Sequence, residues 1–320
     1  MSKKLIIGGS GFIGQNVLNQ SDLSSFINFD KNESKSHSNI TIIGNILNVD
    51  ELESVFLKHE ISEVVLLAAE HKDNVEPKEL YYDVNVNGTK NVLKLMSKYN
   101  VNNLLFTSSV AVYGLNKINP NEQHKVEPFH DYGVSKHLAE KEIKRWFLED
   151  QNRSVTIIRP VVVFGEENRG NVYNLFKQIS ERKFIMIGNG NNKKSMAYVE
   201  NVSAFIRHNL DRESGFEVYN YSDYPDLSMN ELVQICEDEL NIKIPKIKIP
   251  YYLGLVGAFF ISLIFKIFGK TSSINTLRVK KFCATTQFDS SKAHNTSFEP
   301  NSTMIDAIKK TINKEFTLQD

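Results

Sequence analysis

Residues 3–14 are KKLIIGGSGFIG, an apolar strand that leads directly into a loop with glycines at positions 8, 11 and 14. A helical pattern follows and extends to residue 18. Glycines between a strand and a helix let the backbone approach a diphosphate at the helix amino terminus. The stretch therefore predicts a nucleotide-binding loop formed by Gly8, Gly11, Phe12, Ile13 and Gly14.

The next predicted strand, 26–29, ends at Asp30, which lies 22 residues after Gly8. A carboxylate at this place accepts hydrogen bonds from the ribose hydroxyls of a dinucleotide and repels a 2′-phosphate. This favours NAD over NADP, although Lys31 beside it acts in the opposite sense. The alternative is that the glycines only permit close packing and that Asp30 is a solvated turn residue.

Strands and helices alternate along the first half of the chain. Strands are predicted at 3–7, 26–29, 40–43, 63–67, 103–107 and 154–158, and helices at 12–18, 50–59, 77–99 and 132–149, with Asp50 as the cap of the second helix. Such alternation predicts an α/β fold with a Rossmann-type, doubly wound parallel sheet that binds ligands at the carboxyl ends of its strands.

The pattern loosens after Gly165. Helices are predicted at 171–182 and 198–209, a turn at 188–190, and a strand at 217–221 that returns to the sheet. We therefore expect an NAD-binding domain over 1–165, to which 198–222 returns, and a smaller, mixed α/β substrate-binding lobe over 166–320.

The bulk properties narrow the class of protein. The 320 residues are 41% hydrophobic, and 38 basic side chains balance 38 acidic ones with no conspicuous basic run, which argues against nucleic acid as a partner. Cys236 and Cys283 lack the spacing of a metal site, so we expect no metal and a reducing, cytoplasmic location. The apolar part of the amino terminus is too short for a signal peptide.

One apolar segment, 251–265, contains no charged residue. Its 15 residues fall short of the ~20 that span a bilayer, and Gly254 and Gly257 suit close helix packing. We predict a buried or substrate-lining helix. A monotopic contact with a membrane is the less favoured alternative.

Tyr132 and Lys136 begin another predicted helix, in the motif YGVSK. Side chains four residues apart share a helix face, so the phenol and the ammonium can enter one site. An ammonium about 4 Å away, at an effective dielectric of ~20, supplies the roughly 4 kcal/mol that brings a phenol pKa from ~10 to about 7. Ser109 would donate a hydrogen bond to the substrate oxygen whose proton Tyr132 removes or returns. We predict these three residues as the catalytic set.

Further motifs follow in a characteristic order. They are the glycine loop, LAA at 67–69, YYDVNVNGT at 81–89, SSVAVYG at 108–114, YGVSK at 132–136, RP at 159–160 and YVENV at 198–202. Together they resemble the extended short-chain dehydrogenase/reductase family, and within it the NAD-dependent epimerase/dehydratase group that acts on nucleotide sugars. The resemblance covers nearly the whole chain.

The resemblance implies NAD bound in the first lobe. It places Ala68, Ala69 and Asn85 near the cofactor, and Asn45 with its neighbour Ile46 beside the adenine, where an aspartate is usual. The amide carbonyl of Asn45 can accept the same hydrogen bond. Asn85 could equally stabilise the helix on which it lies.

The resemblance also implies a nucleotide-diphosphate sugar as substrate, held by the second lobe. Ser109 and Val110 would contact the sugar. Lys194, which follows a glycine turn where arginine is usual, and Arg278 are the candidates for the diphosphate, although a lysine cannot form the bidentate fork of arginine. Arg278 could also be a plain surface residue.

Two departures from the family pattern bear on the reaction. Val110 and Ala111 stand where related dehydratases carry an Asp-Glu pair, which disfavours dehydration. Val162 stands where many 4-epimerases use an asparagine, and the surrounding RPVVVFG also resembles nucleotide-sugar 4-ketoreductases of surface polysaccharide pathways.

We therefore predict an NAD-dependent epimerase that oxidises and re-reduces C4 of a UDP-hexose or UDP-N-acetylhexosamine through a 4-keto intermediate. A 4-ketoreductase that uses NADH or NADPH is the alternative. A hydroxysteroid-type dehydrogenase and a non-catalytic dinucleotide sensor are further alternatives. Because the helices at 77–99 and 132–149 pair between subunits in relatives, the resemblance also implies a homodimer, although Val134, Leu138, Ile143 and Trp146 could simply be core residues.

Overall fold

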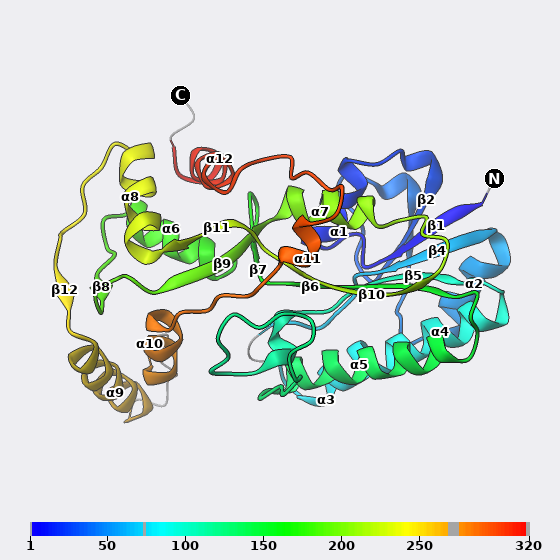
Figure 1. Ribbon diagram of the computed structural model, residues 1–320, viewed down its shortest axis with the longest axis horizontal. Helices are drawn as coiled ribbons and strands as arrows, with labels where there is room; N and C mark the ends of the chain where they lie inside the picture. The colour runs from blue at the N-terminus through cyan, green and yellow to red at the C-terminus, as the bar shows by residue number, and fades with distance from the viewer. Residues whose placement is uncertain (1, 73–74, 268–274, 318–320) are drawn as a thin grey trace. The chain divides into compact units, whose positions relative to one another are not determined.

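The computed structural model describes residues 2–72, 75–267 and 275–317, which form two compact units (Figure 1). Unit 1 comprises residues 1–163, 197–222 and 288–302, and unit 2 comprises 164–196, 223–287 and 303–320. Each unit therefore draws on separate stretches of the chain. The assignment of NAD to one lobe and of the substrate to the other stays a prediction.

Unit 1 contains a seven-stranded sheet in the order β10-β6-β5-β4-β1-β2-β3, in which neighbouring strands run parallel. The strands are β1 (Lys3–Ile7), β2 (Phe26–Asp30), β3 (Thr41–Ile43), β4 (Ile61–Leu66), β5 (Asn103–Thr107), β6 (Ser154–Pro160) and β10 (Gly215–Tyr221). The predicted Rossmann-type fold is confirmed, and the predicted strand at 217–221 does return to this sheet as β10.

The two faces of the sheet bury different helices. Leu5 and Ile7 of β1 belong to the core beneath α2, α4 and α5, whereas Ile6 belongs to the core beneath α1 and α7, because successive strand residues point to opposite faces. The helices of unit 1 are α1 (Phe12–Asn19), α2 (Val49–Lys58), α3 (Glu79–Tyr82), α4 (Gly88–Lys98), α5 (Asp131–Leu148), α7 (Val199–His208) and α11 (Ser291–His294).

The cap of α2 differs from the prediction. Asn48, and not Asp50, is the N-cap, and its Oδ1 accepts hydrogen bonds from the backbone N–H groups of Asp50 at 3.2 Å and Glu51 at 3.3 Å. Asp50 lies inside the first turn, where its negative charge suits the positive end of the helix dipole. The pattern of apolar residues located the helix, but several polar residues near its start could serve as the cap.

The helix expected over 77–99 contains a break in its hydrogen-bonding pattern. A π-helical turn, Asp83–Asn87, separates α3 from α4 and carries the buried Asn85. A π turn accommodates one extra residue per turn and re-aims the side chains around it, and such turns occur often at functional sites. Hydrophobic periodicity alone does not indicate it.

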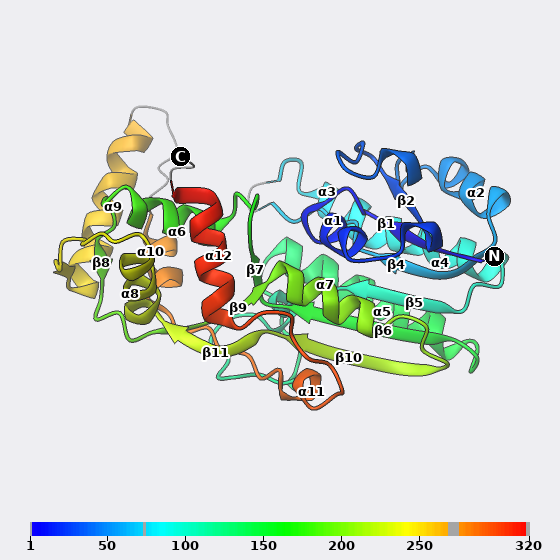
Figure 2. The same cartoon turned by 90° about the horizontal axis from the view of Figure 1, so that it is seen from above.

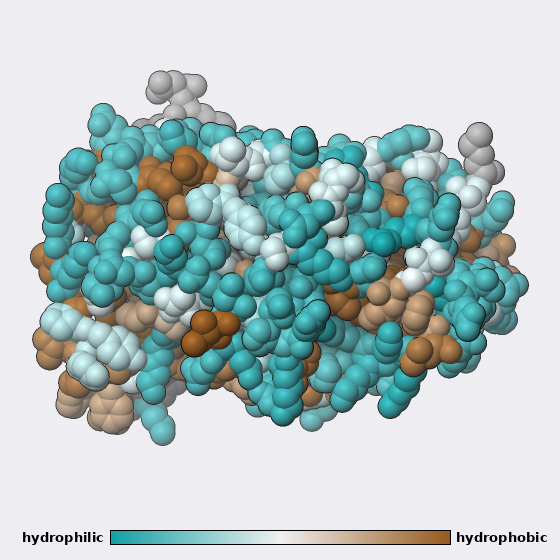
Figure 3. Space-filling view, viewed as in Figure 1, coloured by the Kyte–Doolittle hydropathy of each residue, from teal (hydrophilic) through white to brown (hydrophobic). Residues whose placement is uncertain are grey.

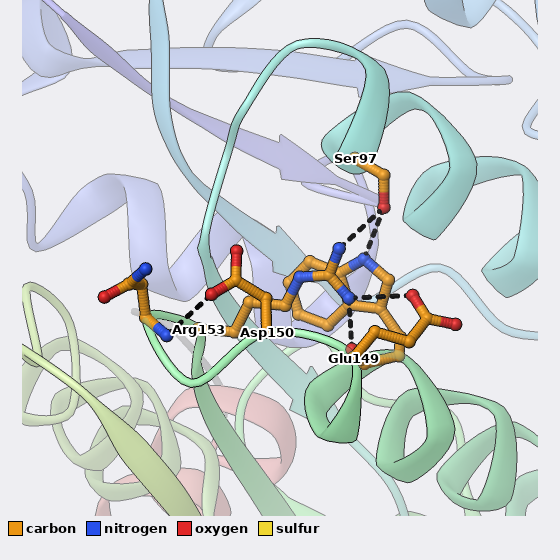
Figure 4. Close-up of polar contacts among 6 residues, drawn as sticks. Ser97, Glu149, Asp150 and Arg153 are labelled. Atoms are coloured by element: carbon orange, nitrogen blue, oxygen red, sulfur yellow. Dashed lines mark hydrogen bonds and ion pairs between the residues drawn. The ribbon is translucent and has the colours of Figure 1, made fainter.

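The carboxyl end of α5 is fixed by Arg153 (Figure 4). Its guanidinium donates to the Trp146 carbonyl, to Glu149 at 3.0 Å and to the Ser97 hydroxyl of α4 at 3.1 Å, and it stacks on the Trp146 ring. A cation at this end complements the helix dipole. Trp146 and Ile143 are buried within the single chain, so they need no partner subunit for their burial, and the homodimer stays a prediction.

A buried carboxyl group in β4 makes the stability of unit 1 depend on pH. Glu63 is 3% exposed, and its oxygens accept from the backbone N–H of Asp211 at 3.2 and 3.4 Å. Burial, opposed by that hydrogen bond, raises the pKa of Glu63 to about 7. The folded protein therefore binds a proton that the unfolded chain releases near pH 4.5, so this contribution is complete below pH 4.5 and is lost as the pH rises through 7.

We expect Glu63→Gln to remove this part of the pH dependence. Between pH 5 and 8 the free energy of unfolding of the natural protein should fall by up to about 3 kcal/mol more than that of the variant. Urea unfolding at the two pH values measures the difference. Glu60→Gln, at an exposed position just before β4, is the matched control, and an equal effect of both variants would contradict the prediction.

Unit 2 is mixed α/β, as predicted. It contains most of an antiparallel pair formed by β9 (Lys193–Tyr198) and β11 (Asp223–Ser228). The short strand β7 (Val162–Phe164) lies at the boundary in sequence between the two units. In unit 2, α12 packs with α8 and α6 (Figure 2). The other elements are α6 (Asn171–Ser180), β8 (Met186–Ile187), α8 (Met229–Glu239), β12 (Lys248–Ile249), α9 (Tyr251–Ile267), α10 (Thr276–Cys283) and α12 (Met304–Phe316).

The apolar segment forms the helix α9, and the prediction of burial is wrong, whereas a substrate-lining role stays a prediction. Tyr252 is 77% exposed and Phe260 is 55% exposed, and large apolar residues remain exposed along its length. Among the residues that the structure describes, no helix is both long and apolar enough to cross a membrane.

Candidate active site

The glycine loop is shaped by close backbone contacts. Gly8 has a φ of +91°, and a Cβ there would lie 2.5 Å from the backbone nitrogen of Ala68. A Cβ on Gly14 would lie 2.5 Å from the Cα of Gly9. The N-cap of α1 is Gly11, so no capping side chain competes for the N–H groups of the first helical turn. These residues fit the diphosphate of a dinucleotide.

Asp30 is held at the end of β2 by this same loop. One of its carboxylate oxygens accepts from the backbone N–H of Ser10 at 3.0 Å, and the other from that of Asn32 at 2.9 Å. Each carboxylate oxygen can accept a second hydrogen bond. The group is therefore oriented against the glycine loop and can still receive ribose hydroxyls.

Asn45 and Ile46 lie between β3 and α2. Asn45 uses its side-chain carbonyl to accept the backbone N–H of Leu47 at 3.0 Å, which is a local turn bond. Ile46 is buried against Gly88, where an added Cβ would come within 3.0 Å of it. Their position beside an adenine stays a prediction.

Asn85 bridges two segments of unit 1. Its amide nitrogen donates to the Glu70 carbonyl at 3.0 Å and to the Ser135 hydroxyl at 2.9 Å, and its carbonyl accepts from the Glu70 N–H at 2.8 Å. It thereby joins the loop of Ala68 and Ala69 to α5, beside Lys136. Both donor hydrogens are engaged, which favours a positioning role over direct donation to a ligand.

Ser109 and Tyr132 come together at the carboxyl end of β5 and the start of α5. The Ser109 hydroxyl accepts from the Ala111 N–H at 3.1 Å. Burial raises the pKa of Tyr132 to about 12, and the nearby Ser109 hydroxyl opposes the rise. Val110, half-buried, follows in a short 3₁₀ turn.

Lys136 lies one helical turn after Tyr132 and is 1% exposed. Its Nζ donates to the Thr107 carbonyl at 2.7 Å and lies 4.5 Å from the centre of the Phe106 ring. Burial lowers the pKa of Lys136 to about 7. The expected lowering of the Tyr132 pKa by this ammonium is not found, because burial of the phenol dominates and Nζ is bonded to the end of β5.

A buried network behind Lys136 was not predicted. Arg159 of β6 donates to both carboxylate oxygens of Glu140, at 2.9 and 2.6 Å, and to the Tyr113 hydroxyl at 2.8 Å. Tyr113 in turn donates to Asn220 of β10 at 2.8 Å. Burial lowers the pKa of Arg159, but the bonds to Glu140 outweigh it and raise the pKa.

Glu140 also connects this network to Lys136, four residues earlier on α5, because its charge raises the pKa of that lysine. The motifs that contain Tyr113 and Arg159 were recognised in the sequence, but their partners were not. Glu140 carries a sequence signal only in its spacing from Lys136 on one helix face.

Lys194 and Arg278 both belong to unit 2. The Lys194 Nζ donates to the carbonyls of Lys281 and Ala284, at 2.9 and 2.5 Å, and so closes the carboxyl end of α10. Burial lowers its pKa to about 8. Arg278 lies exposed in the first turn of α10. A role for either residue in diphosphate recognition stays a prediction.

Comparisons with known proteins place the chain in a family. The model of the NAD dependent epimerase/dehydratase family matches residues 4–221. An Escherichia coli O157:H7 protein, N-acetyl-alpha-D-glucosaminyl-diphospho-ditrans,octacis-undecaprenol 4-epimerase, is 50% identical over 98% of this chain and 95% of its own length.

Solved structures with the same fold include two 4-epimerases. The UDP-glucose 4-epimerase of Thermotoga maritima, solved with UDP-glucose, has a TM-score of 0.76 and 18% identity over 98% of both chains. The UDP-Glc/GlcNAc 4-epimerase of Campylobacter jejuni has a TM-score of 0.74 and 18% identity over 97% of this chain and 98% of its own.

The predicted resemblance, the enzyme class and NAD as cofactor are confirmed by these comparisons. The matched family region ends with β10, so it covers the parallel sheet except for Lys3, together with all the predicted catalytic residues. This chain belongs to the NAD dependent epimerase/dehydratase family.

Proposed function

We propose that this enzyme interconverts the C4 epimers of an N-acetylhexosamine that is linked through a diphosphate to a polyprenol. The observation that carries the proposal is the 50% identity, over nearly the full length of both chains, to an epimerase whose name gives such a lipid-linked sugar as its substrate. The same similarity favours the epimerase over the 4-ketoreductase.

We assign the cofactor-binding residues to unit 1. The loop from Gly8 to Gly14 would hold the diphosphate of NAD, and Asp30 would accept its ribose hydroxyls. Ala68 approaches the same loop closely, and Asn85 fixes the segment that follows it. The chemistry that NAD would supply is the acceptance of a hydride from C4 and its return.

Tyr132 and Ser109 carry the proton chemistry. In its phenolate form, Tyr132 takes the proton of the 4-hydroxyl group as the C4–H bond breaks, and returns it to the oxygen when the hydride comes back to the other face of C4. Ser109, whose hydroxyl lies near Tyr132, donates a hydrogen bond to the same oxygen. Each turnover therefore restores both the proton and the hydride, and no external reductant is consumed.

Lys136 brings a buried positive charge to this site. Its ammonium, buried on Phe106 and held by the Thr107 carbonyl, lies at the end of β5 next to Ser109. With NAD bound, it would donate a hydrogen bond to a ribose hydroxyl of the cofactor. Val110 and Ala111 carry no acid or base, so elimination of water from C6 has no assistance at these positions.

The test uses purified full-length enzyme with N-acetylglucosaminyl diphosphopolyprenol in detergent micelles, beside UDP-N-acetylglucosamine. The substrate carries deuterium at C4, and the released sugars are separated by chromatography and analysed by mass spectrometry. We expect a mixture of C4 epimers that retains the deuterium, with no net formation of NADH.

Other outcomes would overturn the proposal. If the enzyme epimerised only the UDP-sugar, its substrate would be a nucleotide sugar and not a lipid-linked sugar. Consumption of NADH with a 4-keto sugar, without epimerisation, would establish the ketoreductase instead. Loss of the deuterium to solvent would exclude oxidation and reduction at C4.

A further inference from the structure

The helix α9 is attached to unit 2 in an unusual orientation. Its buried residues are small, namely Gly254 and Ala258, and a Cβ added at Gly254 would lie 2.5 Å from Ile187 of β8. Its bulky apolar residues point away from the unit. Surface helices of globular proteins normally do the reverse and bury their large apolar side chains.

Seven of the exposed apolar residues form one continuous stripe, and Phe265, 41% exposed, lies outside it. They recur at spacings of three and four, which places them on the same side of the helix over about 140°. Figure 3 shows part of this surface in brown and tan over α9. Between 43% and 77% exposed, the stripe comprises Tyr252, Leu253, Val256, Phe259, Phe260, Leu263 and Ile264. An apolar patch of this kind on a protein surface marks an interaction site.

The charge of the chain segment that carries α9 is strongly one-sided. Residues 240–288 contain eight Lys and Arg and no Asp or Glu, whereas the remaining 271 residues contain 30 basic and 38 acidic side chains. Seven of the eight lie in the described part of the chain and all seven are exposed: Lys243, Lys246, Lys248, Lys266, Arg278, Lys280 and Lys281. They precede α9, end it, or lie on α10, which packs against it.

We propose that the apolar stripe of α9 and these flanking cations dock the enzyme on an anionic lipid bilayer, with α9 lying in the plane of the headgroup–hydrocarbon boundary. At 17 residues the helix is about 26 Å long, short of the ~30 Å hydrocarbon core, which suits an in-plane helix better than a spanning one. The proposal rests on the proposed function in one respect, that a polyprenyl tail keeps the substrate in a bilayer.

The charge pattern distinguishes the bilayer from a second copy of this chain. If two copies met through their α9 stripes about a twofold axis, each would bring its seven exposed cations against the same seven of the other. Anionic headgroups instead complement them, at about 1 kcal/mol, or fivefold in partition, for each Lys or Arg near the surface. The observations therefore favour a lipid surface.

The test is flotation of the full-length protein, without substrate, on vesicles of phosphatidylethanolamine with phosphatidylglycerol and on vesicles of phosphatidylcholine. We expect binding to the anionic vesicles that weakens with salt. Phe260→Asp should lower the partition coefficient at least tenfold on both kinds of vesicle. Lys246→Glu with Lys280→Glu should lower it at least tenfold on the anionic vesicles only.

Matched controls use equally exposed positions of unit 1. Leu57→Asp, at a residue 70% exposed on α2, and Lys35→Glu with Lys58→Glu should leave flotation unchanged. Circular dichroism checks that each variant is folded. Flotation of the natural protein no better than that of Phe260→Asp would overturn the proposal, as would a dimer in sedimentation equilibrium that Phe260→Asp dissociates while vesicles are not bound.

The membrane-docking proposal and the proposed function can be tested separately. Turnover of the micellar substrate bypasses the bilayer, so Phe260→Asp should match the natural protein in detergent and fall behind it on vesicle-embedded substrate. Flotation without any turnover would retain the docking surface and reject the substrate assignment. Turnover in micelles without flotation would reject the docking surface alone.

Discussion

Tyr132→Phe is expected to lower kcat by about 10³-fold while NAD binding stays within about twofold of the natural protein. The variant keeps the ring and its packing but loses the oxygen that exchanges a proton with the substrate. Ser109 keeps its hydroxyl in the variant, but a serine hydroxyl is not ionised near neutral pH and cannot replace the phenol as the base. Initial rates of epimer formation and a fluorescence titration with NAD measure the two quantities.

Tyr82→Phe is the matched control for this variant. The Tyr82 hydroxyl donates to Asp131, the residue directly before Tyr132, at 2.9 Å, so its loss removes a phenol hydrogen bond at the start of the same helix. We expect a change in kcat of less than about fivefold, the size of one neutral hydrogen bond. Comparable losses in the two variants would mean that Tyr132 acts by holding the helix rather than by moving a proton.

Glu140→Gln is expected to lower the free energy of unfolding by about 3 to 5 kcal/mol. Glu140 and Arg159 are 7% and 6% exposed, and the guanidinium binds both carboxylate oxygens. Without the carboxylate, a charge that never titrates in the accessible pH range remains buried and uncompensated. Denaturant unfolding with a far-ultraviolet signal measures the change.

Two comparisons separate the ion pair from other effects. Glu142→Gln, on the same helix but in a partly exposed pair with Arg145, should cost less than about 1 kcal/mol. Glu140→Gln combined with Arg159→Met should be more stable than Glu140→Gln alone, because the buried charge is removed with its partner. A double variant less stable than the single one would contradict this account.

The sheet of unit 1 was predictable because its strands are short apolar runs separated by helical periods. All six strands expected before residue 160 form, with boundaries within two residues. The π turn around Asn85 and the cap at Asn48 were not predictable, because both depend on which of several nearby polar groups gains a partner in the folded chain. Hydrophobic periodicity shows which face of a helix or strand is buried, but it does not show which polar groups form hydrogen bonds.

The candidate site, like the fold, was predictable only in part. Ser109, Tyr132 and Lys136 are marked by their spacing, and the glycine loop is marked by its place between a strand and a helix. Glu140 and Asn220 carry no motif of their own, because they reach Arg159 and Tyr113 only once β6, β10 and α5 lie together. The pKa of Tyr132 was also not predictable from the sequence. It depends mainly on how deeply the whole fold buries the phenol, whereas sequence spacing identifies only one neighbour, Lys136.

The exposure of α9 was mispredicted for a related reason. The composition of this segment predicts an apolar helix, and apolar helices are usually buried. In α9 the buried residues are instead the small Gly254 and Ala258, with Gly254 packed against β8. The excess of basic residues over 240–288 was hidden in the balanced total of 38 and 38. Charge counted over segments would have indicated it.

Unit 1 is formed by segments that lie far apart in the chain, and this has a consequence for its biosynthesis. β6 pairs with β10 along seven residues, yet more than 50 residues separate the two strands in the chain, and residues 288–302 join the unit later still. A chain emerging from the ribosome therefore carries β6 as an unpaired edge until β10 is translated, and unpaired edges recruit other strands. Nascent chains that stall between these two strands are the ones we expect to need a chaperone.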